Sequence, residues 1–347
     1  MHGKSPATLR LVLTLLIAAS GGGMLWHMHM PLAWLLGAMI ATGLAALLRL
    51  PVAMPAFARP PMTAMIGAML GTAFQPSLFD HAALWLASLT GLALFIAAAG
   101  GIGYVFYRKF AGFDHPTAYF SAMPGGLVEM VTLAAERGGD EKTVALIHAA
   151  RIFLVVLTLP FLIEFLTGEP IARTGGSDVP LAGIDISDLG WFAVATILGA
   201  VLGKHLRLPA SHLLGPMTAS AILHLSGLTD FAIPAVALGF AQLIIGATVG
   251  CRFGMASPRE ILRIIGLSIG STGLLLATSL GFAAILSTFT GDRFLALVLA
   301  YSPGGIAEVS IVALSIGIEV PFVVLHHIVR VMLVVAGSAL LFRCFQR

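Results

Sequence analysis

Two blocks of the sequence each carry a glutamate, a histidine and an arginine at the same spacing. The first block has Glu129, His148 and Arg151, and the second has Glu308, His327 and Arg330. The segments around them are apolar, and ionisable groups in such segments are costly to keep. A poorly solvated glutamate can hold and release a proton near neutral pH, and an arginine can contact an anion. We therefore expect these side chains to line a substrate or ion pathway.

A Pro-Gly-Gly motif precedes each glutamate. Its two copies are Pro124, Gly125 and Gly126, and Pro303, Gly304 and Gly305. Proline suits the first position of a helix and glycine permits a sharply turned backbone, so the motif predicts that a short helix begins there. The N-terminus of such a helix carries free N–H groups that can hold an anionic group. A kink that only aids helix packing is the alternative.

Each histidine lies three residues before its arginine, so the two side chains share one face of a helix. Such a pair can contact an anion or gate a pathway. Two structural alternatives stay open: each histidine can be a buried group with satisfied hydrogen bonds, and each arginine can form an ion pair with a glutamate of either block. An ion pair would make that glutamate a poor proton carrier.

The two blocks belong to an internal duplication. Residues 122–154 align with residues 301–333 without a gap, at an offset of 179. The same offset relates Gly67 and Gly71 to Gly246 and Gly250, pairs whose spacing is typical of closely packed helices. We therefore divide the chain into a first membrane repeat of residues 1–168, an acidic external linker of residues 169–186, and a second membrane repeat of residues 187–347.

The composition is that of a protein that crosses a bilayer many times. Hydrophobic residues make up 58% of the chain, charged residues only 10%, and the mean hydropathy is +0.99. Apolar runs of roughly 20 residues, long enough to span a bilayer, follow one another along the chain. The predicted spans are residues 9–26, 31–48, 60–75, 82–107 and 142–166 in the first repeat, and 187–203, 210–226, 234–251, 264–288 and 321–342 in the second.

The positions of lysine and arginine predict the topology, because positively charged loops stay in the cytoplasm. If the remaining apolar pieces, residues 117–135 and 294–316, enter and leave on one side, only Arg173 and Arg293 fall in external loops. We therefore predict an all-α polytopic transmembrane protein with two inverted repeats of about five spans each, plus one re-entrant Pro-Gly-Gly hairpin per repeat. Both termini are then cytoplasmic, and the protein lies in the bacterial plasma (inner) membrane.

Inverted repeats with broken helices are a recurring plan of secondary transporters. The sequence therefore predicts a transporter of a small solute by alternating access, and the arginines and helix N-termini favour an anionic solute. A membrane protein that affects gene expression by sensing or moving a metabolite is the alternative.

Other function classes find little support in the sequence. It contains no nucleotide-binding glycine loop, serine-histidine-acid set or metal-binding cluster, so we expect no enzyme, no metal and no cofactor. The basic residues are dispersed among several loops, which does not predict binding to nucleic acid. The expected partners are the lipid bilayer and a small molecule or ion, and the sequence leaves the oligomeric state open.

The motifs AMPGGLVEM with HAAR, and YSPGGIAEV with HIVR, resemble those of the AbrB-duplication family of Gram-negative inner-membrane proteins. The similarity covers nearly the whole chain. The resemblance implies a polytopic plasma-membrane protein. It also implies one of two activities, because members of the family are labelled as regulators of gene expression or as ammonia monooxygenases.

Overall fold

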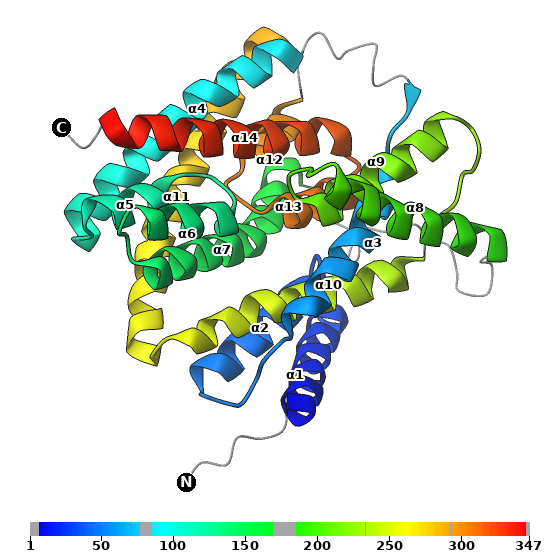
Figure 1. The fold of residues 1–347 in the computed structure, drawn as a ribbon, viewed down its shortest axis with the longest axis horizontal. Helices are drawn as coiled ribbons and strands as arrows, with labels where there is room; N and C mark the ends of the chain where they lie inside the picture. The colour runs from blue at the N-terminus through cyan, green and yellow to red at the C-terminus, as the bar shows by residue number, and fades with distance from the viewer. Residues whose placement is uncertain (1–6, 77–84, 169–184, 233, 292, 345–347) are drawn as a thin grey trace. The chain divides into compact units, whose positions relative to one another are not determined.

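The computed structural model describes residues 7–76, 85–168, 185–232, 234–291 and 293–344 (Figure 1). These residues form fourteen α-helices joined by short turns, so the predicted all-α fold is confirmed. The predicted linker of residues 169–186 lies outside the described residues apart from its last two.

The helices follow one another along the chain as Figure 1 labels them. Their bounds are α1 (Ala7–His27), α2 (Ala33–Leu47), α3 (Arg59–Gly71), α4 (Trp85–Phe106), α5 (His115–Ala122), α6 (Leu127–Glu136), α7 (Glu141–Thr167), α8 (Ile186–His205), α9 (Ser211–Leu225), α10 (Ala235–Cys251), α11 (Pro258–Thr290), α12 (Phe294–Tyr301), α13 (Ile306–Ser315) and α14 (Val320–Cys344). A π-helical turn, η3 (Tyr107–Ala111), extends α4, and the 3-10 turns η1 (Ala56–Ala58) and η5 (Arg252–Met255) flank α3 and α10.

Four helices of the second half begin at the residues that the offset of 179 predicts. The starts of α1, α5, α6 and α7 lie 179 residues before those of α8, α12, α13 and α14. The two halves therefore adopt corresponding elements in the same order. The opposite orientation of the halves in a membrane stays a prediction.

Seven helices are long and apolar enough to cross a membrane. Among the described residues they are Ala7–His27, Trp85–Lys109, Glu141–Thr167, Ile186–His205, Val236–Gly254, Pro258–Thr290 and Val320–Gly337. The other three predicted spans are α2, α3 and α9, which have 15, 13 and 15 residues. At 1.5 Å per residue they are roughly 20–23 Å long, shorter than a hydrocarbon core of about 30 Å. The count of ten crossings therefore stays a prediction.

The chain forms two compact units, and each draws on both halves of the sequence. The first unit comprises Met1–Leu78, Leu159–Pro258 and Ser310–Val320. Within it α2 packs against α1 and α10, while α9 packs against α8 and α3. Each half thus contributes a helix that packs against the other half.

Glycines allow the close helix packing of the first unit. A Cβ atom added to Gly67 of α3 would overlap the carbonyl oxygen of Leu213 on α9, and one added to Gly246 of α10 would overlap that of Leu35 on α2. Only residues without a side chain permit main chains to approach so closely. The packing role predicted for these glycine pairs is confirmed.

The second unit holds both Pro-Gly-Gly motifs. It comprises Phe79–Thr158, Arg259–Val309 and Pro321–Arg347. Here α5 packs against α4 and α6, and α12 contacts α4. Buried hydrogen bonds join the two halves of the sequence, such as that between the Tyr107 hydroxyl and Ser271 Oγ at 2.7 Å. This unit therefore positions every residue of the predicted site.

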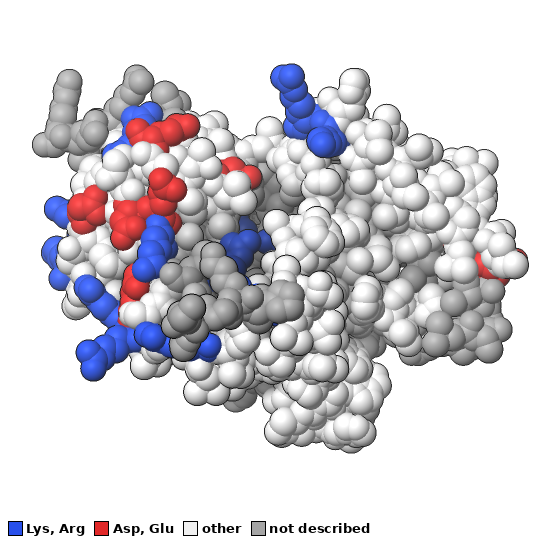
Figure 2. Space-filling view, turned by 60° about the horizontal axis from the view of Figure 1, so that its bottom comes forward, with Lys and Arg blue, Asp and Glu red and all other residues white. Residues whose placement is uncertain are grey.

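The surface is largely apolar, as membrane-spanning helices require. Large hydrophobic side chains such as Leu94, Phe165 and Ile197 are well exposed. In the face shown in Figure 2, uncharged residues cover broad areas between the acidic and basic groups. Apolar surface on this scale is unusual in a protein surrounded by water.

Candidate functional site

Two breaks in the helical chain carry the Pro-Gly-Gly motifs. The first break, Met123–Gly126, separates α5 from α6, and the second break, Ser302–Gly305, separates α12 from α13. The predicted start of a short helix after each motif is confirmed. Helix α6 begins at Leu127, because Gly126 before it is extended (φ −68°, ψ 142°), and Pro124 lies inside the break.

Glutamate carboxylates cover the N-termini that follow the breaks. Glu129 and Glu308 lie in the first turns of α6 and α13. A Cβ atom added to Gly126 or Gly305 would overlap the carboxylate of Glu129 or Glu308. The negative charge favours the positive end of the helix dipole. The chain's own acids thus occupy the places where an anionic ligand was expected.

Arginines hold the carbonyl groups of the same breaks. Arg151 on α7 donates from Nη1 to the carbonyl oxygen of Met123 at 3.2 Å. Arg330 on α14 donates to the carbonyl oxygens of Ser302 and, at 2.8 Å, Gly304. Both arginines are almost completely buried. Each therefore neutralises the negative end of the helix that runs into its break.

Histidines orient these arginines. His148 Nδ1 lies 2.8 Å from Arg151 Nη2, and His327 Nδ1 lies 3.2 Å from Arg330 Nη2. A guanidinium group can only donate, so each Nδ1 accepts. Each Nε2–H then donates to a carbonyl oxygen, that of Phe120 at 2.9 Å or that of Leu299 at 3.0 Å. Both rings are neutral and both nitrogens of each ring are hydrogen-bonded. This agrees with the alternative in which each histidine is a buried group with satisfied hydrogen bonds.

The two breaks pack crosswise against α7 and α14. A Cβ atom added to Gly125 of the first break would lie 2.9 Å from Val334 Cγ1 of α14. One added to Gly304 of the second break would lie 3.1 Å from Val155 Cγ1 of α7. Each valine lies one turn beyond the arginine of its helix. Each of these helices therefore binds one break through arginine and packs against the other through valine.

Both arginines lie buried beside the two breaks of one compact unit. In the part of the chain that the structure describes, their contacts are carbonyl groups and histidines, with no carboxylate among them. Both Nε–H groups are buried and make no hydrogen bond to described residues. Two buried like charges lacking an acidic partner form a site suited to an anion.

A second polar network lies next to the second copy of the site, and no sequence motif predicted it. His326 Nε2 lies 3.0 Å from Ser88 Oγ, and the Tyr301 hydroxyl donates to the Ser88 carbonyl oxygen. All three residues are buried. His326 has no histidine counterpart 179 residues earlier, where Ile147 stands, so the duplication could not identify it.

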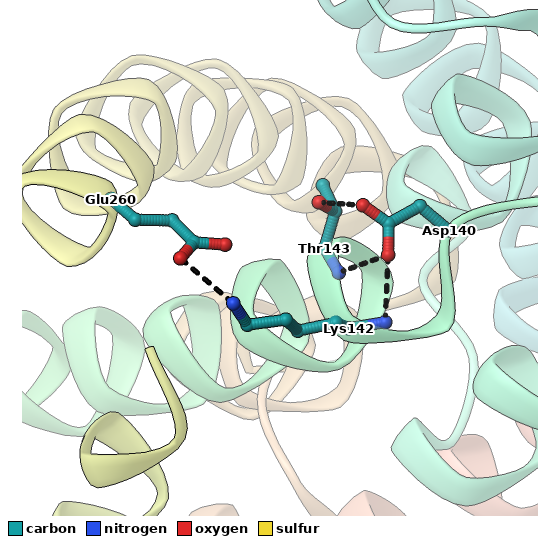
Figure 3. A network of polar contacts seen from close by, with 4 residues as sticks. All are labelled: Asp140, Lys142, Thr143 and Glu260. Atoms are coloured by element: carbon teal, nitrogen blue, oxygen red, sulfur yellow. Dashed lines mark hydrogen bonds and ion pairs between the residues drawn. The ribbon is translucent and has the colours of Figure 1, made fainter. Parts of the chain in front are cut away.

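The start of α7 carries a separate polar cluster (Figure 3). Asp140 Oδ1 accepts from the backbone N–H groups of Lys142 and Thr143 at 3.0 and 3.2 Å, and Oδ2 accepts from the Thr143 hydroxyl at 2.6 Å. Partial burial raises the pKa of Asp140, but these hydrogen bonds outweigh it and the pKa is lowered. Lys142 forms a partly exposed ion pair with Glu260 at 2.8 Å, an interaction of small energetic value.

A catalytic metal centre does not fit the described residues. No three His, Cys, Asp or Glu side chains among them lie together in a way that could hold a metal ion. An oxygenase centre built on copper or iron needs such a donor set. The monooxygenase activity that the family resemblance implied thus has no set of ligands in this part of the chain.

Comparison with known proteins finds one matching family model and two relatives that are similar to most of the chain. Residues 34–346 match a family model described as "Transition state regulatory protein AbrB". The protein YhjN of Bacillus subtilis strain 168 is 30% identical over 350 residues, covering 92% of this chain and 89% of the relative. A protein of Escherichia coli strain K12 named "Putative regulator AbrB" is 28% identical over 286 residues, with 82% of each chain covered.

Proposed function

The chain belongs to the AbrB family, and we propose that it is a secondary transporter that moves a small anionic solute across the bacterial plasma membrane by alternating access. In this proposal the two halves are inverted repeats with cytoplasmic termini, and the two breaks lie at the centre of the transport pathway. We propose no catalytic activity for it.

The arrangement of the breaks supports the transport proposal. Transporters built from inverted repeats place discontinuous helices at the midplane, where half-helix ends meet the substrate. Here the two breaks lie in one compact unit, and each is packed against the last helix of both halves. Two related breaks that enter from opposite faces can exchange roles as the pathway opens to each side.

The observation that carries the choice of an anion is the pair of buried arginines. Ionisable groups inside a membrane are costly and mark substrate or ion pathways. Arg151 and Arg330 are both buried beside the breaks and keep one N–H group each without a partner in the described structure. A bound carboxylate or similar oxyanion would offset their charges and accept those hydrogens.

The glutamates are the candidates for coupling transport to protons. Glu308 is 1% exposed, whereas Glu129 is half-buried. Equivalent acids in unequal surroundings are expected in a transporter whose pathway is open to one side at a time. In our proposal each glutamate takes a proton when its own side is open, and the histidines keep the arginines in position.

Solute flux into proteoliposomes tests this function. Metabolites that differ between deletion and overexpressing cells would supply the solutes to assay. We expect Glu129→Gln and Arg330→Ala to abolish flux, while Glu136→Gln and Arg293→Ala, at exposed positions, keep it. Folding is checked by size-exclusion chromatography. Flux that persists unchanged in both site variants would remove these residues from the pathway.

A role in gene regulation is the second candidate function. It is favoured by the description of the matching family model and by the name of the Escherichia coli relative. Such a protein would sense a metabolite or change its level in the cytoplasm. Transcript changes upon deletion, without movement of any solute in a broad metabolite screen, would favour this function over transport.

A further inference from the structure

An apolar cavity of about 310 Å³ lies in the second unit beside the first break. Small-molecule sites begin at roughly this volume. The lining consists of Ala93, Ile96, Ala97, Gly100, Gly101 and Tyr104 of α4, Tyr119 of α5, Met123 of the first break and Leu333 of α14. Ala93, Ala97 and Leu333 are exposed, so the cavity opens at the surface of this unit.

Two positions of α4 that line the cavity carry smaller side chains than the positions 179 residues later on α11. The offset of 179 places Leu276 and Leu280 of α11 at the positions of Ala97 and Gly101. Both leucines are partly buried. A Cβ atom added to Gly101 would meet no atom within 4 Å. Two isobutyl groups in one half thus correspond to a methyl group and a hydrogen atom in the other.

The lining excludes charged ligands. None of its side chains is charged, and the Tyr104 hydroxyl is already hydrogen-bonded to His115 Nδ1 at 2.8 Å. A charged group in such a place would lose its hydration without gaining a partner. The positions of α11 that lie 179 residues after Ala97 and Gly101 carry branched aliphatic groups.

We propose that this cavity binds an uncharged aliphatic group of a ligand. The group comes from one of two sources, the acyl chain of a phospholipid or the alkyl part of a small solute. In either case it lies against Ala97 and Gly101, whose counterparts at the offset of 179 are Leu276 and Leu280. The cavity contains none of the glutamates, arginines or histidines of the transport site, so this proposal stands apart from the transport proposal.

Photolabelling of the full chain in phospholipid vesicles tests the proposal. One arm uses a phospholipid with a diazirine in its acyl chain, and the other uses a short alkyl diazirine added from the aqueous phase. Mass spectrometry then locates the label. We expect labelled peptides containing Tyr104, Tyr119 or Met123, and the arm that gives the stronger signal identifies the source.

Two variants fill the cavity and one is matched to them. Gly101→Leu and Ala97→Leu place on α4 the leucines that α11 has at the equivalent positions. We expect each variant to lower the labelling about tenfold, the change that 1.4 kcal/mol of lost affinity gives. Gly281→Leu makes the same glycine-to-leucine change on α11, where an added Cβ meets open space, and should leave the labelling unchanged. If Gly101→Leu does not fold, Ala97→Leu decides the question. Absence of label from the cavity in both arms, or undiminished labelling in a folded cavity-filling variant, would overturn the proposal.

Discussion

At each break, the charged side chains have the sign opposite to that of the helix end beside them. The positive Arg330 donates to the carbonyl groups of Ser302, which follows α12, and of Gly304 within the break, while the negative Glu308 carboxylate lies beside Gly305 at the start of α13. The same arrangement surrounds the first break with Arg151 and Glu129. A broken helix in a membrane exposes unsatisfied carbonyl and amide groups. The arginines donate to such carbonyl groups and the glutamates place negative charge beside the helix N-termini, so these side chains stabilise the breaks as well as providing charge.

Replacement of Arg330 should reveal that stabilising role. Arg330→Gln leaves buried carbonyl groups without their donor, which costs about 1–3 kcal/mol per unsatisfied group. We expect a lower unfolding free energy in detergent solution and a smaller loss for Arg330→Lys, which keeps the charge. Arg293→Gln, at an exposed position, should change stability by less than about 0.5 kcal/mol. If Arg330→Gln unfolds at the same denaturant concentration as the wild type, the contacts of Arg330 with the carbonyl groups contribute nothing to stability.

The sequence predicted only some of the contacts that the site residues make. Equal spacing correctly paired His148 with Arg151 on one helix face, because helix geometry alone decides which residues three apart are neighbours. It could not predict that Glu129 folds back over its own helix or that Arg151 binds Met123. Those contacts depend on side-chain rotamers and on the path of the chain through the break, neither of which spacing determines.

At the scale of the elements, Asp140 caps the N-terminus of α7 and gives a pH-dependent contribution to stability. The pKa of Asp140 is lower in the folded protein than its ordinary value of 3.8. The stabilisation is therefore complete above the unfolded-state pKa, and it is lost as the pH falls through the lower folded-state pKa. Asp140→Ala should cost about 1 kcal/mol at pH 7.

Asp140→Asn separates the cap from its charge. Asparagine is also a good capping residue, so this variant should stay close to wild type at pH 7 and lack the dependence on Asp140 ionisation. Chemical unfolding measured from pH 7 down through the acidic range would show the difference between the two variants. Equal pH dependence of wild type and Asp140→Asn would contradict the assignment.

Helix packing in the first unit depends on particular glycines. Gly246→Ala would force α10 away from Leu35 on α2, and overpacking of this kind costs about 1–3 kcal/mol. Gly273→Ala on α11 meets open space and should gain up to about 1 kcal/mol from better helix propensity. Thermal unfolding of the purified variants should therefore shift in opposite directions, and a shared direction would argue against the close approach.

Hydrophobicity predicted the positions of the elements better than their lengths. Each predicted span coincides with a helix, but α2, α3 and α9 are shorter than hydrophobicity alone indicated. A window of apolar residues does not distinguish a helix from the apolar turn that follows it. In α3, for example, the apolar run continues past Gly71, where the helix ends.

At the scale of the whole molecule, the compact units do not follow the sequence repeats. The first unit takes α1 to α3 from one half and α8 to α10 from the other, and the second unit takes the breaks from both. The constant offset indicated which residues correspond, but correspondence does not specify which helices pack together. The crossed contacts of Gly125 with Val334 and of Gly304 with Val155 therefore came from the structure alone.

The central claim is that the two hairpins enter the membrane from opposite faces and together form the transport site. Cysteine labelling in intact cells tests it most directly, with Cys251 and Cys344 replaced by alanine. Glu136→Cys and Glu319→Cys place single thiols at exposed positions, the first at the end of α6 and the second just before α14. We predict that a membrane-impermeant maleimide labels the cysteine at position 319 from outside, and labels that at position 136 only after the cells are permeabilised. Labelling of both cysteines from the same side would contradict the inverted arrangement.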